Sequence, residues 1–194
     1  MDQMKLERRA TMATLLKNRD DDLLVVPGLG STAWDAAAAG DNDRNFYLWG
    51  AMGGAAMIGL GLALAQPRRR VAVITGDGEM LMGLGSLATI GAQRPRNLAV
   101  IVFDNGVYGE TGMQPSHTQS GVDLIGVAGA CGIGTCLDVR DENGLSDLAR
   151  SLKNLRETLF ARVLIAAEEP PRVLPLRDGV ALKERFRAAI GIRA

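Results

Sequence analysis

Residues 71–109 read VAVITGDGEMLMGLGSLATIGAQRPRNLAVIVFDNGVYG. One apolar run, typical of a buried strand, ends in Gly76-Asp77-Gly78, and a second ends in Asp104-Asn105-Gly106. The segment between the two runs has the character of a helix, so the strands are joined by a crossover and run parallel. Parallel strands bring their carboxyl ends to one edge of the sheet. The stretch therefore predicts two polar strand ends that meet at one site.

The alternation of strand and helix extends over the rest of the chain. We expect strands at residues 23–26, 45–49, 71–75, 98–103, 136–139 and 161–167. We expect helices at residues 5–18, 53–65, 81–90, 123–130, 144–158 and 183–190. The central strands are continuous apolar runs, which is typical of a parallel sheet covered on both faces. The pattern predicts an α/β fold, a doubly wound and mostly parallel sheet with helices on both faces, in a single domain of residues 1–194.

Composition limits the class of protein. Of the 194 residues, 47% are hydrophobic and 23% are charged, and the formal net charge of zero gives no basis for binding nucleic acid or an anionic membrane. The first ten residues carry no signal sequence, and the glycine-rich apolar residues 51–65 are too short to cross a bilayer. We expect a closely packed buried helix there, and a cytoplasmic protein. Cys131 and Cys136 have neither metal nor disulfide spacing and are interpreted as small buried hydrophobes.

Asp77 and Asn105, one at each strand end, offer hard oxygen ligands. Such ligands suit Mg²⁺, which completes its octahedron with phosphate oxygens and water. The glycines around Asp77 leave room for a phosphate against the backbone, and the helix that starts near Glu79 offers free amides and the positive end of its dipole. Each tripeptide alone is a good turn sequence. Two of them at this separation, each ending an apolar strand, favour a metal and diphosphate site over a pair of turns.

The two strand ends carry a family resemblance. Gly76-Asp77-Gly78, 25 further residues, and then Asp104-Asn105 with Tyr108-Gly109 resemble the signature of the thiamine-diphosphate-dependent enzymes. The resemblance implies that Mg²⁺ is held by Asp77, Asn105 and the backbone carbonyl of Val107. It puts the other residues of the signature against the cofactor, namely Gly76, Gly78, Glu79, Tyr108 and Gly109.

Two residues of this signature depart from what the site would favour. Asp104 stands where the family pattern has Asn, although the ligand Asn105 is retained. The acidic side chain of Glu79 would repel a diphosphate. We therefore expect that side chain to point away from the cofactor while its backbone amide donates.

The segment Trp49–Gly53 resembles the part of these enzymes that passes under the middle of the bent cofactor. The resemblance implies that the carbonyl of Gly50 accepts a hydrogen bond from the amino group of the aminopyrimidine. It makes Met52 the bulky side chain that enforces the V shape of the cofactor. Taken alone, Met52 would be an ordinary core methionine. The flanking glycines and the downstream signature favour the cofactor role.

A narrower resemblance covers the chain from about Leu23 to its end. The segments NFYLWGAMG, IGLGLALA, LATIG, DNGVYGETGMQ and LPLRDGV are similar to those of the sulfopyruvate and phosphonopyruvate decarboxylase group. In this group sulfopyruvate decarboxylase is split into two chains, and the present length fits the β subunit, which carries the diphosphate-binding half. The resemblance implies a carboxy-lyase that acts on a 2-oxoacid and uses thiamine diphosphate and Mg²⁺.

The same resemblance implies a partner. In the family, a glutamate on a separate pyrimidine-binding domain activates the cofactor, and this chain has no room for that domain. The resemblance therefore implies an α subunit that supplies the glutamate and a hetero-oligomer with the active site at a subunit interface. This chain alone would be inactive.

Residues 107–119 are expected to form a loop or a mobile segment after the metal ligands. Its short polar side chains can orient a substrate or shuttle a proton; they are Thr111, Gln114, Ser116 and His117. His117 is the candidate catalytic residue, and a solvated loop is the alternative.

Other interpretations stay open. Gly28–Ala33 fits the G-x-G-x-x-A fingerprint of an NAD-binding dehydrogenase, but no clear strand ending in an acidic residue follows at the expected distance, so residues 28–31 are interpreted as another loop at the same sheet edge. Lys183, Arg185 and Arg187 on the last helix can meet a sulfonate, although a solvated face is favoured. A phosphonopyruvate decarboxylase, an acetolactate-synthase-like carboligase and a non-catalytic structural subunit are the further alternatives. The sequence does not choose the 2-oxoacid.

Overall fold

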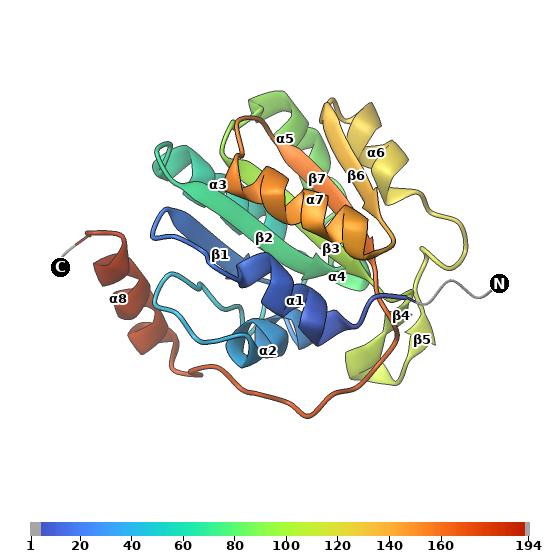
Figure 1. Cartoon of the computed structure of the whole chain (residues 1–194), viewed down its shortest axis with the longest axis horizontal. Helices are drawn as coiled ribbons and strands as arrows, with labels where there is room; N and C mark the ends of the chain where they lie inside the picture. Colours follow the sequence, from blue (N-terminus) through green and yellow to red (C-terminus); the bar gives the residue numbers. More distant parts are fainter. Residues whose placement is uncertain (1–4, 193–194) are drawn as a thin grey trace.

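One parallel sheet organises the molecule. The computed structural model describes residues 5–192, and Figure 1 shows the arrangement of its helices and strands. Five parallel strands follow the order β1-β2-β3-β7-β6. Their bounds are β1 Leu23–Pro27, β2 Arg70–Gly76, β3 Leu98–Asp104, β6 Thr135–Val139 and β7 Leu159–Leu164. The prediction of a doubly wound, mostly parallel sheet is confirmed.

Helices cover both faces of this sheet. One layer contains α1 Arg8–Leu16, α2 Ser31–Ala38 and α7 Glu142–Lys153, and the other contains α3 Ala55–Ala65, α5 Ser86–Gln93 and α6 Leu124–Ala130. Successive residues of β2 point to opposite layers: Ala72 and Ile74 pack into the first, and Val71 and Val73 into the second. The central strands therefore bury both faces, which explains why they read as continuous apolar runs.

The predicted helix at residues 81–90 is two helices in the structure. The first, α4 Asp77–Met82, begins directly at the end of β2, and α5 begins at Ser86. A Cβ on Gly83, which lies between them, would come within 2.2 Å of the carbonyl oxygen of Gly53. This close backbone approach divides the helix and brings the turn before α3 against α4. The free helix N-terminus consequently lies at Asp77 rather than near Glu79.

Three other segments differ from the expected elements. The turn after β1 leads at once into α2, which the sequence reading missed. The strand expected at residues 45–49 is reduced to a single bridge between Asn45 and Val25. The helix expected at residues 144–158 ends at Lys153.

The predicted loop at residues 107–119 is ordered as a small hairpin. Strand β4 Val107–Tyr108 pairs antiparallel with β5 Gln114–Pro115, and a single 3-10 turn, η1 Gly109–Thr111, lies between them. The backbone amide of Ser116 then donates to the carbonyl of Gly106. The hairpin therefore folds back to the carboxyl end of β3.

Burial departs from expectation in two places. One face of α3 is exposed, with Met57 at 43% and Leu64 at 51%, so the prediction of a buried helix is correct for its other face only. Cys131 and Cys136 are free and only half-buried, although both pack against the second layer. Within residues 5–192, no helix combines the length and the apolar character that crossing a membrane requires.

The last segment returns across the molecule. After β7 an extended segment runs past α2 to α8 Gly179–Ala189 (Figure 1). The ring of Phe186 on α8 meets Phe46 edge to face, with centroids 5.2 Å apart. Arg185 on the same helix pairs with Asp41 at 2.7 Å and with Asp43 at 3.6 Å. The interpretation of this helix face as merely solvated is therefore wrong for Arg185.

Candidate functional site

A cavity of about 660 Å³ opens at the carboxyl ends of the central strands. It gathers residues from the ends of β2 and β3, the β4–β5 hairpin, the start of α2 and the segment after β7. Nine of the predicted site residues line it: Met52, Gly76, Asp77, Gly78, Glu79, Asn105, Val107, Tyr108 and Gly109. The remaining two, Gly50 and His117, are exposed and do not line this cavity.

Asp77 occupies the first position of α4 and is only 2% exposed. Its Oδ2 accepts hydrogen bonds from the hydroxyl of Ser116 and, at 3.2 Å, from that of Thr118. Burial raises the pKa of the Asp77 carboxyl, and the nearby charge of Asp104 raises this pKa as well. A buried carboxylate of this kind is stabilised by a cation.

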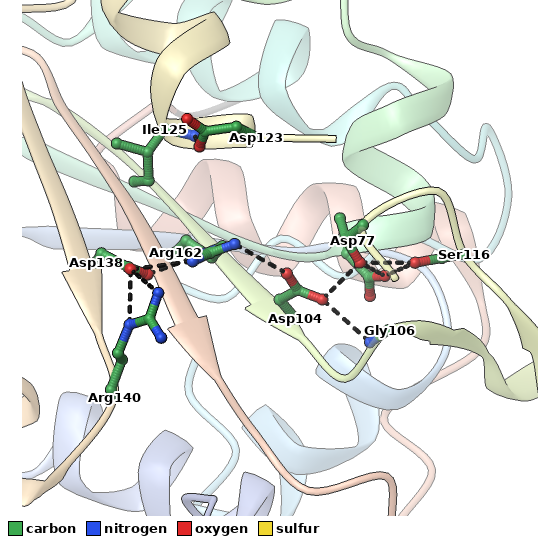
Figure 2. A network of polar contacts seen from close by, with 10 residues as sticks. Asp77, Asp104, Gly106, Ser116, Asp123, Ile125, Asp138, Arg140 and Arg162 are labelled. Carbon is green, nitrogen blue, oxygen red and sulfur yellow. Dashed lines mark hydrogen bonds and ion pairs between the residues drawn. The ribbon is translucent and has the colours of Figure 1, made fainter. Parts of the chain in front are cut away.

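The end of β3 presents its two polar residues differently. Oδ1 of the buried Asp104 accepts from the backbone amide of Gly106 at 3.0 Å and from the hydroxyl of Thr118 at 2.9 Å. Oδ1 of Asn105, which lines the cavity, accepts from the amide of Val107 at 3.0 Å and keeps a second lone pair. Figure 2 shows the carboxylates of Asp77 and Asp104 side by side, with Ser116 on the far side of Asp77.

The glycines on either side of Asp77 have separate steric roles. A Cβ on Gly78 would come within 2.5 Å of the ring of Tyr108, so only glycine lets β4 pack this closely on α4. A Cβ on Gly76 would meet nothing within 4 Å. The backbone at Gly76 is therefore open to the cavity, as a phosphate-binding turn requires.

The Glu79 side chain is held on the side of β1. Its Oε2 accepts from the hydroxyl of Thr75 at 2.7 Å and from the backbone amide of Leu29 at 3.0 Å. Burial raises the pKa of the Glu79 carboxyl, and these two hydrogen bonds lower it by less. The carboxylate fills the Gly28-Leu29-Gly30 turn, which the sequence marks as a dinucleotide fingerprint.

The oxygen atoms at this edge fit Mg²⁺ better than a metal that needs an all-protein cage. Among residues 5–192 there is no group of three or more His, Cys, Asp or Glu side chains arranged for a metal. Asp77 and Asn105 supply one carboxylate and one amide oxygen, which are hard ligands. Mg²⁺ is commonly bound by one or two carboxylates together with phosphate oxygens and water.

Sequence reasoning missed two of the groups that hold these side chains. Thr118 bridges Asp77 and Asp104, and Arg162 lies with its Nη1 at 3.9 Å from Asp104. The sequence predicts that Ser116 orients a substrate or shuttles a proton, whereas in the structure its hydroxyl donates to Asp77. The acidic residue at position 104 was the available signal for a nearby cation, but no local pattern points to β7.

His117, the candidate catalytic residue, is exposed and follows the hairpin. Its Nδ1 is 3.5 Å from the hydroxyl of Tyr108. The catalytic role of His117 stays a prediction.

Comparisons with known proteins agree with this geometry. The family described as "Thiamine pyrophosphate enzyme, C-terminal TPP binding domain" matches residues 30–164. Sulfopyruvate decarboxylase subunit beta of Methanocaldococcus jannaschii is 36% identical over 184 residues, which are 91% of this chain and 93% of that subunit. Phosphonopyruvate decarboxylase of Streptomyces viridochromogenes is 45% identical over 191 residues, which are 94% of this chain but 46% of that protein.

A solved structure adds the fold. Benzoylformate decarboxylase from Polynucleobacter necessarius superposes with a TM-score of 0.69 over 88% of this chain and 35% of that one, at 20% sequence identity. At this identity the likeness concerns the arrangement of the elements alone.

Proposed function

The chain belongs to the thiamine pyrophosphate enzymes, and on that premise we propose that it is the diphosphate-binding subunit of a thiamine-diphosphate- and Mg²⁺-dependent 2-oxoacid decarboxylase. Sulfopyruvate decarboxylase subunit beta is the relative that this assignment follows, because the match covers 93% of that subunit. In this proposal residues 1–194 form one diphosphate-binding domain of a cytoplasmic enzyme. Expression of a fluorescently tagged chain in its source cells would test the location.

One observation carries the proposal. Asp77 and Asn105, from the ends of the adjacent strands β2 and β3, line the same cavity beside the open backbone of Gly76. Together with the carbonyl of Val107, they would hold Mg²⁺ and, through it, the diphosphate. Isothermal titration should detect binding of thiamine diphosphate with Mg²⁺ present and none with EDTA. Binding that is indifferent to the metal would refute the site.

The rest of the cofactor would extend toward Met52. That side chain is 40% exposed and lines the cavity, where it can act as the wedge under the bent cofactor. The bound cofactor supplies the carbon nucleophile and the electron sink for loss of carbon dioxide from a 2-oxoacid. The chain's own residues would bind and orient the cofactor, and the carbonyl of the exposed Gly50 would accept from the aminopyrimidine.

We propose that a pyrimidine-binding α subunit supplies the activating glutamate and completes a hetero-oligomer. Support comes from coverage: this chain spans 93% of a subunit named beta but less than half of the phosphonopyruvate decarboxylase. The purified chain should therefore fail to decarboxylate, and co-expression with a pyrimidine-binding α subunit should restore turnover. Full turnover by the chain alone would contradict this part of the proposal.

The substrate's second anionic group requires a cation, and the candidates from sequence do not supply it. Lys183, Arg185 and Arg187 do not line the cavity, and Arg185 is already paired with Asp41. The cavity is lined by two arginines: Arg8, which is paired with the buried Asp35, and Arg172, which stacks 4.5 Å from the ring centroid of Trp34. Within residues 5–192 no ion pair of Arg172 is formed. Arg172 is therefore our candidate for the sulfonate.

Kinetics of the assembled enzyme test this assignment. Arg172→Met should raise KM for sulfopyruvate about tenfold, as expected for a lost charge-assisted contact, and leave pyruvate unaffected. Arg177→Met is the matched control, because Arg177 stacks on Trp49 without lining the cavity. The 45% identity to a phosphonopyruvate decarboxylase makes phosphonopyruvate the second substrate to assay. A carboligase would instead join the cofactor-bound fragment to a second 2-oxoacid, which product analysis would detect.

A further inference from the structure

Two carboxylates lie close together at the proposed metal site. Asp77 and Asp104 are 2% and 4% exposed, and the hydroxyl of Thr118 lies within hydrogen-bond distance of both carboxylates, at 3.2 and 2.9 Å. Asp104 is not a proposed metal ligand, and its Oδ1 serves the amide of Gly106 and Thr118. A neutral side chain oxygen can accept these bonds equally well. The negative charge of Asp104 is therefore unnecessary for these two hydrogen bonds and unfavourable beside a diphosphate.

Arg162 is the cation that faces this charge. In the sheet, Arg162 of β7 is the register partner of Val102 in β3, two residues before Asp104, so both side chains stand on the same face. Its Nη1 lies 3.9 Å from Oδ2 of Asp104, and the two side chains are 16% and 5% exposed. Figure 2 shows Arg162 between Asp104 on one side and Asp138 on the other.

Asp138 fixes the guanidinium in this place. It is the register partner of Arg162 in β6 and accepts from Nε at 2.9 Å and from Nη2 at 3.0 Å. Arg140 binds the same carboxylate at 2.6 Å. Two of the three guanidinium nitrogens are thus occupied by Asp138, which leaves Nη1 directed at Asp104. Because Arg140 also pairs with Asp138, the charge of Arg162 is not used up by Asp138 and can balance that of Asp104.

We propose that Arg162 is a positioning residue that neutralises Asp104, so that the metal site presents the net charge it would have with a neutral residue at position 104. The proposal rests on the proposed function and concerns the charge balance between metal and diphosphate. The proposal predicts that loss of Arg162 changes the affinities for the metal ion and for the diphosphate in opposite directions. Without Arg162, the uncompensated Asp104 attracts a divalent cation and repels a diphosphate.

The experiment uses the full chain and two separate probes. Mn²⁺ alone is titrated by electron paramagnetic resonance, and inorganic pyrophosphate is titrated by calorimetry at saturating Mg²⁺. For Arg162→Met we expect roughly tenfold tighter Mn²⁺ binding and roughly tenfold weaker pyrophosphate binding, the order of effect of one unit charge within several ångströms of a partly buried site. Arg162→Lys, which keeps the charge, should shift both constants less.

Asp104→Asn provides the decisive control. It keeps an accepting oxygen and removes the charge, so the double variant Arg162→Met/Asp104→Asn should return both constants to within about threefold of the unaltered chain. A purely structural role for Arg162 would weaken both ligands together, and Asp104→Asn would not reverse that loss. Circular dichroism and thermal melting identify a variant that does not fold; the Arg162→Lys and Asp104→Asn variants then carry the same comparison.

The outcomes separate the two proposals. If the unaltered chain binds neither Mn²⁺ nor pyrophosphate, the metal and diphosphate site fails, and the role of Arg162 fails with it. If the unaltered chain binds both, but Arg162→Met moves the two constants in the same direction or not at all, the function stands and the neutralising role is overturned.

Discussion

Two glycine-rich turns follow neighbouring parallel strands, and the structure uses them in opposite ways. Gly28-Leu29-Gly30 follows β1 and precedes α2, while Gly76-Asp77-Gly78 follows β2 and opens α4. Both turns place backbone amides at the start of a helix, where an anion is favoured. The first turn is filled by the chain's own anion, the carboxylate of Glu79 on the amide of Leu29. The second is open to the cavity.

The comparison shows that a glycine pattern predicts the geometry of a turn but not which anion binds to the turn. The turn after β1 fits a dinucleotide fingerprint, yet its nearest anion comes from within the molecule. A Cβ on Gly28 would lie 1.9 Å from Oε2 of Glu79, so glycine there makes room for a side chain and not for a phosphate. The family match to a thiamine pyrophosphate domain agrees with this and not with an NAD-binding dehydrogenase.

The largest expected effect comes from removing the carboxylate of the open turn. Asp77→Ala should weaken Mg²⁺-dependent binding of thiamine diphosphate on the order of a hundredfold or more, about 2.7 kcal/mol, because the proposed site loses its carboxylate ligand. The melting temperature of the metal-free chain should change little, because the loss of the hydrogen bonds from Ser116 and Thr118 opposes the relief of a buried carboxyl.

Glu110→Ala is the matched control for Asp77→Ala. Glu110 lines the same cavity but lies against Gly30 of the filled turn. Its removal should leave the metal dependence intact. Equal losses from the two variants would mean that the acidic character of the cavity matters and the end of β2 does not.

Alanine substitutions in the two turns should have different effects: Gly28→Ala should lower stability, and Gly76→Ala should lower cofactor affinity. Gly28→Ala should destabilise the fold by about 2 kcal/mol, because the new methyl group expels the buried Glu79 carboxylate from its two hydrogen bonds. Gly76→Ala has space and should leave stability unchanged, while the added methyl hinders the phosphate and weakens cofactor binding. Urea denaturation measures the stability of both variants, and calorimetry measures their cofactor affinity. A Gly76→Ala chain that binds the cofactor normally would show that the open turn is not its site.

Sequence patterns predicted the open turn well because its information is local. An apolar strand followed by Gly-Asp-Gly, repeated at the next strand by Asp-Asn-Gly, locates both polar ends, and parallel topology alone brings them together. The strands β1, β2 and β3 were predicted for the same reason, since a fully buried strand must be apolar on both faces.

The features that the sequence did not predict depend on contacts between residues far apart in the chain. The division between α4 and α5 follows from the packing of Gly83 on Gly53, thirty residues apart, and the occupant of the first turn follows from Glu79 reaching Leu29 across β2. Arg162 reaches Asp104 only because β7 inserts next to β3, before β6 in the sheet order. Periodicity reports burial along one element and is silent about such pairings.

The Glu79 carboxyl in the filled turn should make the stability of the chain depend on pH. Burial raises the pKa of Glu79 above its usual value of 4.5, so the native chain holds a proton there more tightly than the unfolded chain does. That contribution to stability is complete below about pH 4.5 and is lost as pH rises through the raised native pKa. Glu79→Gln has no such proton to lose, so its stability relative to the unaltered chain should increase with pH, by about 1.4 kcal/mol for each pKa unit by which burial raises the Glu79 pKa.

Urea titrations of both chains at pH 4.5 and pH 7.5, with EDTA present, measure this difference. Asp77 titrates in both chains and cancels. A constant difference between the two pH values would mean that Glu79 is as easily ionised in the native chain as in the unfolded one.

The smallest effects should come from the two hydroxyl groups that hold the carboxylates. Thr75 donates to Glu79 and Ser116 donates to Asp77, so the two contacts are matched in chemistry but belong to different turns. Each is worth about 1 kcal/mol, the net value of one hydrogen bond. Thr75→Val should reduce stability by this amount and leave metal affinity unchanged, because the Glu79 side chain, held by Thr75 and Leu29, is not a proposed metal ligand. Ser116→Ala should instead change Mn²⁺ affinity about fivefold. Without the Ser116 hydroxyl, Oδ2 of Asp77 has a free lone pair and the Asp77 side chain is no longer held in one orientation. If Thr75→Val also altered Mn²⁺ affinity, the filled turn would be coupled to the metal through β2, and the two turns would have to be treated as one site.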